Sequence, residues 1–237
     1  MIGAGRAPIA VALDAPDMET AARWAASVER YVSCVKVGLE LFCRYGPDVV
    51  KVVRGGTHVD LFLDLKLHDI PVTVAGAARS VARLKPSYLT VHASGGPAMI
   101  RAAVDAAPDV AIAGVTILTS LAESDLAAVG LAGPARDAVR RLAVLAVGCG
   151  ARALVCSPHE VASVRGEVGP DITLITPGVR PAGSGADDQA RTATPQQALA
   201  DGADLLVIGR PITAASDPGA AAAAIAAALP PRARSHS

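Results

Sequence analysis

The sequence alternates regularly between short runs rich in β-branched residues and longer amphipathic or alanine-rich stretches. Eight runs of each kind follow one another along the chain. This order is typical of parallel strands joined by crossover helices, because a parallel pair of strands needs a long return connection. Eight βα units favour a closed (β/α)₈ barrel over an open doubly wound sheet, since such barrels commonly take about 250 residues and this chain has 237.

No linker divides the chain, so we expect an α/β fold with a single domain. The barrel would cover residues 1–229, and residues 230–237 would form a flexible polar tail. The expected strands are residues 9–13, 34–37, 59–66, 88–93, 110–118, 153–156, 172–176 and 204–208. The expected helices are residues 18–30, 39–53, 72–84, 98–106, 135–147, 160–167, 195–200 and 218–229.

The composition argues against several kinds of partner. Lysine plus arginine and aspartate plus glutamate both number 22, so the chain lacks the positive charge with which proteins bind nucleic acids or anionic membranes. No apolar run approaches the ~20 residues that span a bilayer, and the first residues do not resemble a secretory signal. We therefore expect a cytoplasmic protein. The four cysteines have no zinc-binding spacing, so we expect reduced thiols in the core and no metal.

Three charged residues, Asp64, Lys66 and Asp69, interrupt an otherwise apolar run at residues 62–71. Burying an ionised side chain is costly unless the charge is paired or used. Asp64 and Lys66 lie two apart on an expected strand and therefore face the same side. Asp69 follows where the strand should turn, before Pro71 begins a helix. An active site and a structural ion pair both explain this spacing, and the spacing alone leaves the two open.

Other polar residues lie where the strands of such a barrel end, which is where its ligand sites form. Asp14 ends the first expected strand and Lys36 lies in the second, so with Asp64 and Lys66 they could form a row of alternating charge at one mouth. Thr119 ends the fifth expected strand.

Gly209 and Arg210 follow the eighth expected strand and predict a phosphate site. Glycine lets backbone N–H groups approach an anion, and a guanidinium group fits phosphate geometry. Loops after strands seven and eight often hold phosphate in these barrels. Outside the barrel context, a solvent-exposed loop arginine would explain Arg210 equally well.

The charged stretch also resembles a known family. The segment DLKLHDIPVT, with Asp64, Lys66 and Asp69, resembles the signature of orotidine 5′-monophosphate decarboxylases. Further matches follow in order over nearly the whole chain: VALD ending at Asp14, KVG from Lys36, VTILTS from Val115, TPGVRP from Thr176, Gln189 and VIGRP from Val207.

The resemblance implies a metal-free enzyme, without a cofactor, that decarboxylates orotidine 5′-monophosphate on a (β/α)₈ barrel. It implies catalytic roles for Asp64, Lys66 and Asp69, and a two-fold dimer in which Asp69 reaches the neighbouring subunit's site. The substrate contacts that it implies are Asp14 and Lys36 at the ribose, Thr119 at the pyrimidine, Arg180, Gln189, Gly209 and Arg210 around the phosphate, and Thr73.

Two alternatives stay open at this point. Related sugar-phosphate enzymes, such as 3-keto-L-gulonate 6-phosphate decarboxylase, share the barrel and the D-x-K-x-x-D signature but use magnesium. Lys36 argues against them, because it places a cation where those relatives place a carboxylate ligand. The other alternative is a non-catalytic nucleotide-binding barrel, which the intact set of Asp64, Lys66 and Asp69 disfavours.

Overall fold

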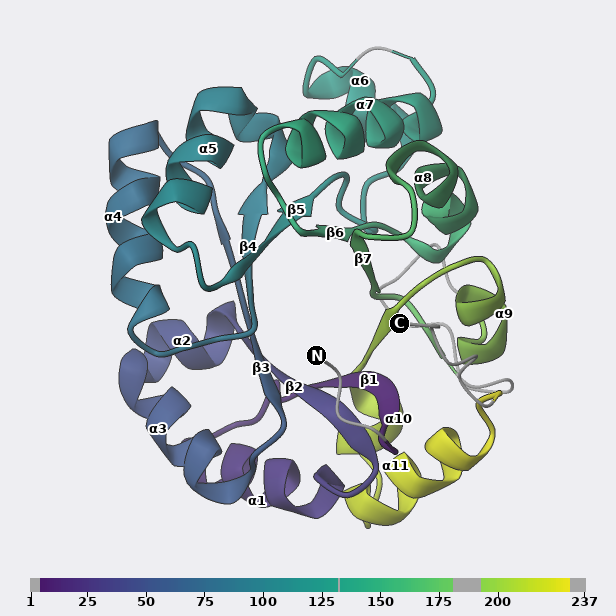
Figure 1. The fold of residues 1–237 in the computed structure, drawn as a ribbon. Helices are drawn as coiled ribbons and strands as arrows, with labels where there is room; N and C mark the ends of the chain where they lie inside the picture. Colours follow the sequence, from purple (N-terminus) through teal and green to yellow (C-terminus); the bar gives the residue numbers. More distant parts are fainter. Residues whose placement is uncertain (1–4, 132, 181–192, 231–237) are drawn as a thin grey trace.

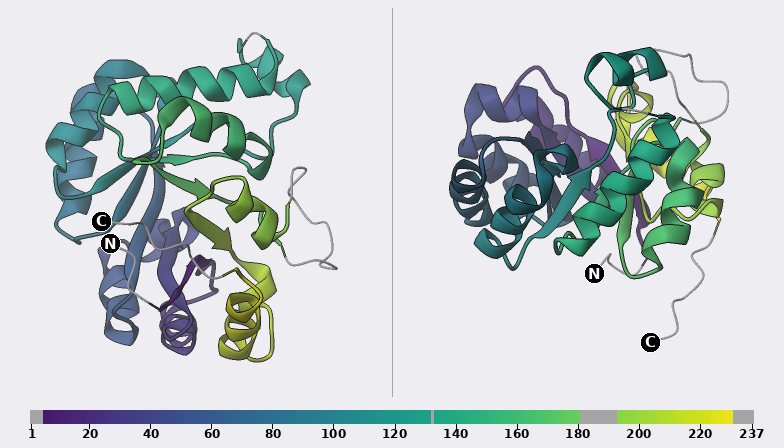
Figure 2. Two further views of the ribbon diagram at one scale, coloured as in Figure 1. Left: turned by 45° about the vertical axis from the view of Figure 1, so that its right-hand side comes forward. Right: turned by 90° about the horizontal axis from the view of Figure 1, so that it is seen from above.

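The computed structural model of the chain describes residues 5–131, 133–180 and 193–230. In these residues eight strands close into a barrel in sequence order, with helices on the outside (Figure 1). All neighbouring strands are parallel, including β1 and β8, which close the ring. The expected (β/α)₈ barrel is confirmed. Figure 2 shows the helices around the strands from two further directions.

The elements alternate in the expected order. The strands are β1 (Ala7–Ala12), β2 (Val32–Gly38), β3 (Asp60–Leu67), β4 (Tyr88–His92), β5 (Ala111–Val115), β6 (Ala153–Val155), β7 (Thr173–Thr176) and β8 (Leu205–Ile208). The helices are α1 (Met18–Val28), α2 (Leu39–Tyr45), α3 (Pro47–Gly56), α4 (Pro71–Ala82), α5 (Gly96–Ala106), α6 (Glu123–Ala128), α7 (Ala135–Gly148), α8 (Val161–Val168), α9 (Pro195–Ala200), α10 (Arg210–Thr213) and α11 (Pro218–Ala227), with short 3₁₀ turns η1 (Ala93–Gly95) and η2 (Pro158–Glu160).

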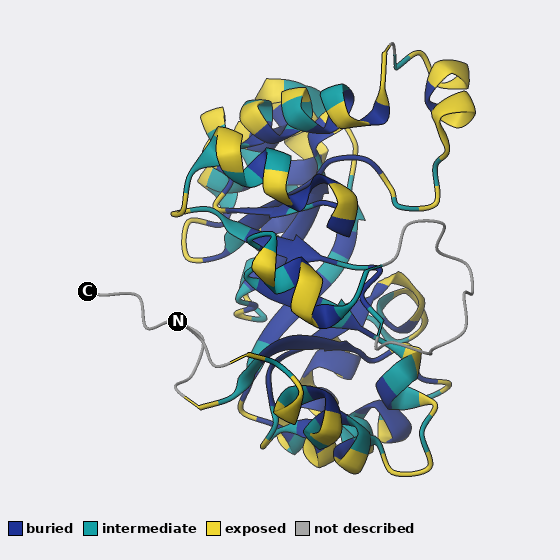
Figure 3. Ribbon diagram, turned by 90° about the vertical axis from the view of Figure 1, so that its right-hand side faces the viewer, coloured by how far each residue is buried: buried dark blue, intermediate teal, exposed yellow. Residues whose placement is uncertain are grey.

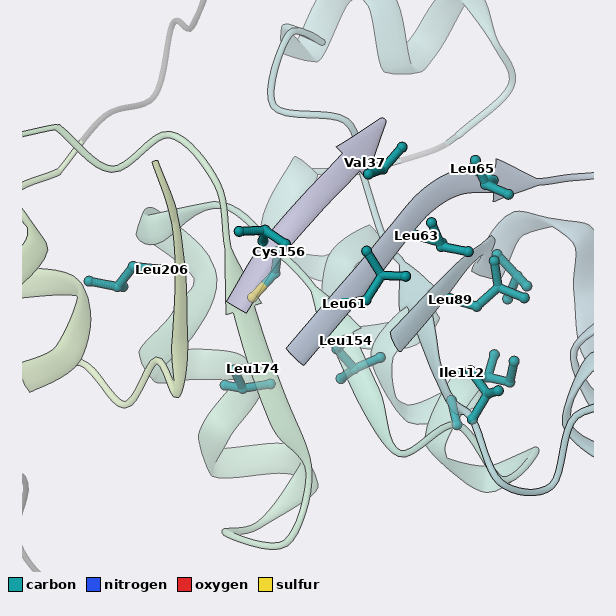
Figure 4. Close-up of a cluster of buried hydrophobic side chains, with 14 of the residues drawn as sticks. Val37, Leu61, Leu63, Leu65, Leu89, Ile112, Leu154, Cys156, Leu174 and Leu206 are labelled. Carbon is teal, nitrogen blue, oxygen red and sulfur yellow. The ribbon is translucent and has the colours of Figure 1, made fainter. Parts of the chain in front are cut away.

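The strands separate two apolar layers. A small cluster that includes Phe62 and Tyr88 fills the barrel, where the two rings meet edge to face with centroids 6.0 Å apart. A larger cluster packs between the strands and the surrounding helices; Figure 4 shows part of it, including Leu61, Leu63 and Leu89. Burying a leucine contributes about 1.5–3 kcal/mol, so this outer layer is the main source of stability. Figure 3 shows the strands buried and the outer helix faces exposed.

The expected helix at residues 39–53 is two helices. Gly46 separates α2 from α3 with a φ of 58°, a left-handed value that glycine adopts without strain. Pro47 then begins α3, and the residue before a proline is disfavoured in a helix. The Gly46-Pro47 pair therefore indicates the break between the two helices, although the apolar periodicity continues across it.

Three other expectations need correction. The strand expected at 110–118 ends at Val115, because its neighbour β6 stops at Val155 and leaves nothing to pair with. Helix α6 was not expected; Figure 3 shows it standing out from the barrel. The cysteines are all free, but Cys43 is exposed and not part of the core. Of the expected tail, residues 231–237 lie outside the described residues.

Candidate active site

A cavity of about 290 Å³ opens at the carboxyl ends of the strands, the edge at which sites form in this fold. Most of the sequence-predicted residues line it: Asp14, Lys36, Asp64, Lys66, Thr119, Arg180, Gly209 and Arg210. The rest of the wall is mainly apolar and includes Phe62, Ile117 and Val155. A few charges in an apolar wall are typical of small-molecule sites.

The expected row of alternating charge is present on one side of this cavity. Lys36 Nζ lies 3.6 Å from Asp14 Oδ1 and 3.4 Å from Asp64 Oδ2. Lys66 Nζ lies 2.8 Å from Asp64 Oδ1. The Lys36 and Asp64 side chains are only 10% and 13% exposed, so these charges interact in a medium that screens them less than water does. Each member of the row fixes the position of the next.

Asp64 is ionised despite its burial. Burial raises the pKa of the Asp64 carboxyl, but the ammonium groups of Lys36 and Lys66 and hydrogen bonds from Lys66 and Thr90 outweigh it, so the pKa lies below its usual value. Both lysines therefore face a carboxylate. An ammonium group held in this way can stabilise negative charge that develops on a bound molecule, and it can donate a proton.

An irregularity of the backbone brings Asp64 and Lys66 into this arrangement. Leu63 pairs with Leu89 and Leu67 with Val91, so four steps along β3 match two along β4. Lys66 lies within this bulge and has a φ of 48°, left-handed and unusual for a residue with a side chain. Bulges beside active sites commonly re-aim a side chain. No pattern in the sequence predicted this one.

Thr90, which the sequence did not single out, holds the bulge. It is fully buried in β4. Its hydroxyl oxygen accepts a hydrogen bond from the Lys66 backbone N–H at 2.7 Å, and the hydroxyl donates to Asp64 Oδ1 at 3.1 Å. A threonine within the apolar strand YLTVH was the available signal, although threonine is common in strands.

Two histidines lie beside the row. His68, for which the sequence suggested no role, stacks on His92 with ring centroids 5.2 Å apart. Burial lowers the pKa of His92, and the neighbouring His68 and Lys66 lower it further, whereas Asp64 acts in the opposite direction. His92 is therefore neutral at pH 7.

The structure separates Asp69 and Thr73 from the other predicted residues. Both are exposed and neither lines the cavity of its own chain. Asp69 Oδ1 accepts a hydrogen bond from the backbone N–H of Ile70 at 2.6 Å, and Thr73 lies in the first turn of α4. Gln189, together with most of the loop that follows Arg180, lies outside the described residues.

A further part of the wall comes from the loops after β7 and β8. Arg180 and Arg210 line it, and Gly209 precedes the short helix α10. In a ring of eight strands β7 lies opposite β3, so Arg180 follows the strand opposite Asp64 and Lys66. Arg210 follows β8, which pairs with β1 and so neighbours the strand that leads to Asp14. Thr119 also lines the cavity. The sequence predicted that it ends β5, but β5 ends at Val115 and Thr119 follows four residues later.

The described residues offer less support for a metal site, a cysteine nucleophile or a membrane span. No group of three or more histidine, cysteine, aspartate or glutamate side chains in this part of the chain is arranged to hold a metal ion. Burial raises the pKa of the Cys156 thiol in the cavity wall to about 12, with a further increase from Glu160, so it is not a thiolate nucleophile at neutral pH. No helix in the described ranges is long and apolar enough to cross a membrane.

Comparison with known proteins decides the family. The model of the orotidine 5′-phosphate decarboxylase / HUMPS family matches residues 7–225, which include all eight strands and the whole described site. The chain belongs to this family. The resemblance expected from the sequence is therefore confirmed.

Individual relatives agree with this assignment. The orotidine 5′-phosphate decarboxylase of Thermobifida fusca (strain YX) is 74% identical over 223 residues, which cover 94% of this chain and 96% of that protein. The one of Frankia casuarinae is 62% identical over 242 residues, covering 95% and 88%. A crystal structure of the enzyme from Lactobacillus acidophilus superposes with a TM-score of 0.80 at 37% identity, covering 92% of this chain and 97% of that one.

Proposed function

We propose that this chain converts orotidine 5′-monophosphate into uridine 5′-monophosphate and carbon dioxide, in pyrimidine nucleotide synthesis in the cytoplasm. The observation that carries the proposal is the Lys66 ammonium group, which lies in the cavity and is held at 2.8 Å by the buried Asp64 carboxylate. The family of the chain and its 74% identity to a relative named for this reaction support it.

The reaction needs a cation at one carbon atom. When the bond between C6 of the pyrimidine and its carboxylate breaks, carbon dioxide leaves and the electron pair stays on C6. The Lys66 ammonium stabilises that charge as it forms and then donates its proton to C6, which gives uridine monophosphate. Lys66 afterwards regains a proton from solvent. The net change is consumption of one proton and release of one carbon dioxide.

The position of Asp64 supports two contributions to the reaction. Asp64 keeps Lys66 charged and aimed, as their direct contact suggests. It also lies where the substrate carboxylate would approach, and two unit charges about 4 Å apart repel by roughly 4 kcal/mol at an effective dielectric constant of 20. Departure of neutral carbon dioxide would relieve that repulsion. Binding of the remote phosphate would supply the free energy for the approach.

The other residues of the cavity divide by position. We assign Asp14 and Lys36, on the β1 and β2 side, to the ribose hydroxyls and Thr119 to the pyrimidine edge. We assign Gly209, Arg210 and Arg180, which follow β8 and β7, to the phosphate, together with Gln189. Arginine side chains suit this task because their planar donors match phosphate oxygens.

Asp69 and Thr73 fit the same function only if a second subunit is present. Asp69 is absent from the cavity lining of its own chain. Close to it, the apolar side chains of Ile70 and Val72 are 62% and 72% exposed, and Leu39 is also exposed at the start of α2. Apolar groups exposed together mark interaction surfaces. We propose a two-fold dimer through this face, in which Asp69 and Thr73 reach the partner's cavity.

The test is an absorbance assay for loss of orotidine 5′-monophosphate, run with and without EDTA. We expect turnover that EDTA leaves unchanged, because Lys36 lies between the two nearest carboxylates and would repel a divalent cation. Activity that EDTA removes and Mg²⁺ restores would favour a sugar-phosphate enzyme of the same family. Tight binding of uridine monophosphate without turnover would indicate a non-catalytic nucleotide-binding barrel.

A further inference from the structure

We propose that Thr90 is a positioning residue, whose hydroxyl holds the bulged backbone of β3 so that Lys66 and Asp64 meet in the geometry that the reaction needs. The inference rests on the proposed function, in which Lys66 donates the proton. Thr90 itself is not in the cavity lining, so it acts through these two residues.

The hydroxyl makes both contacts at once. Its oxygen accepts a hydrogen bond from the backbone N–H of Lys66 at 2.7 Å, and the hydroxyl donates one to Asp64 Oδ1 at 3.1 Å. The same Asp64 oxygen accepts from Lys66 Nζ at 2.8 Å. One oxygen therefore ties the Lys66 backbone to the carboxylate that orients the Lys66 side chain.

The tie is needed because β3 and β4 are out of step there. The two extra residues of β3 between Leu63 and Leu67 have no ladder partners on β4, so the N–H of Lys66 needs another acceptor. Lys66 also has a left-handed backbone conformation, which persists in a residue with a side chain only where its surroundings enforce it. The Thr90 hydroxyl provides that constraint from a fully buried position.

The experiment compares Thr90→Val, Thr90→Ser and wild type. Valine keeps the shape of threonine and removes the hydroxyl, so we expect kcat to fall about ten- to a hundredfold, the loss that accompanies removal of a buried hydrogen bond to a charged group. The Kd for uridine monophosphate should change less than about threefold, because the contacts proposed for ribose and phosphate remain. Serine restores the hydroxyl and should restore most of kcat.

A matched control is Thr176→Val. Thr176 is also fully buried at the end of a strand, but its hydroxyl has no hydrogen-bond partner among the described residues. The same chemical change should leave kcat unchanged there. Thermal unfolding of all variants shows whether a loss of kcat merely follows a loss of folded protein. If Thr90→Val does not fold, Thr90→Ala and Thr90→Ser make the same comparison, since they differ by the hydroxyl alone.

The pH profile separates positioning from a purely structural role. The Asp64 carboxylate is faced by Lys36 from β2, Lys66 from its own strand, and Thr90 and His92 from β4. A hydrogen bond donated to a carboxylate lowers its pKa, so its loss in Thr90→Val should move the acid limb of kcat/KM to higher pH. Wild-type kcat and an unshifted limb in folded Thr90→Val would overturn the inference. Absence of turnover in the wild type would instead overturn the proposed function.

Discussion

Lys66 combines three features that rarely occur together in one residue. It carries a positive charge in a cavity wall, its backbone is left-handed, and its Nζ lies 2.8 Å from a buried carboxylate. Such strain costs about 1–3 kcal/mol and is found where the surrounding structure has a use for it. The proposed proton donor is therefore also one of two described non-glycine residues, with Lys85, that have a left-handed backbone.

Replacing Lys66 by alanine should abolish turnover and leave product binding measurable. The ammonium is needed chiefly while charge develops at C6, so kcat should fall at least about a thousandfold. Calorimetry with uridine monophosphate measures the binding that remains. The control is Lys51→Ala, since Lys51 is exposed in α3 and pairs with the exposed Asp48. A Lys66→Ala enzyme with near wild-type kcat would be incompatible with the proposed mechanism.

Asp64 should contribute to stability in a pH-dependent way. Its folded pKa is lowered, so its contribution is complete above the unfolded value of about 3.9 and is lost as pH falls through the lower folded value. Asp64→Asn should lower the free energy of unfolding by about 3 kcal/mol at pH 7, and the difference from wild type should shrink below about pH 4. Urea unfolding at several pH values measures it.

The exposed pair of Asp48 and Lys51 supplies the comparison for that measurement. Asp48→Asn should change the free energy of unfolding by less than about 1 kcal/mol at any pH, because solvent screens the pair. A difference between wild type and Asp64→Asn that stayed constant from pH 7 to pH 3 would argue that folding does not lower the pKa of Asp64.

At the level of elements, the sequence predicted the barrel and the carboxyl ends of most of its strands, with β5 as the exception. Asp14, Lys36, Asp64 and Lys66 could be placed in one row because neighbouring parallel strands end at the same edge, and each charge interrupts an apolar run. The bulge in β3 and the contact with Thr90 could not be predicted. They depend on how two strands fall out of register, and a threonine is too common in strands for Thr90 to have predicted it.

Gly38, at the end of β2, leaves the space in which the charged side chains of Lys36 and Asp14 lie. A Cβ atom there would lie 3.0 Å from Lys36 Nζ and 3.1 Å from Asp14 Oδ1. Gly38→Ala should therefore push the ammonium away and weaken uridine monophosphate binding about five- to tenfold, with the fold intact because the Gly38 backbone is extended. Gly55→Ala in α3, where a Cβ would meet nothing, is the control and should leave binding unchanged. If both variants bind uridine monophosphate with equal affinity, the absence of a side chain at Gly38 is not needed for binding.

At the level of the whole molecule, the cavity of one chain is lined by only part of the predicted set of residues. Asp69 and Thr73 do not line the described cavity of their own chain, and exposed Ile70 and Val72 lie beside them. The sequence could place Asp69 only at the turn that follows the strand, and under the proposed dimer the site that it serves belongs to a second copy. The proposed dimer therefore makes a prediction that a single-chain site does not make.

Mixing inactive Lys66→Ala and Asp69→Ala dimers should restore activity once subunits exchange. If Asp69 acts across the interface, a mixed dimer has one site with both defects and one with neither. Random exchange of equal amounts makes half the dimers mixed, so about a quarter of all sites should be intact. The control mixture, Lys66→Ala with Asp64→Ala, should stay inactive, because both residues line the cavity of the same chain and every mixed site keeps one defect. If native mass spectrometry confirms exchange and the first mixture also stays inactive, Asp69 acts within its own chain and the shared site is wrong, while the decarboxylase assignment stands.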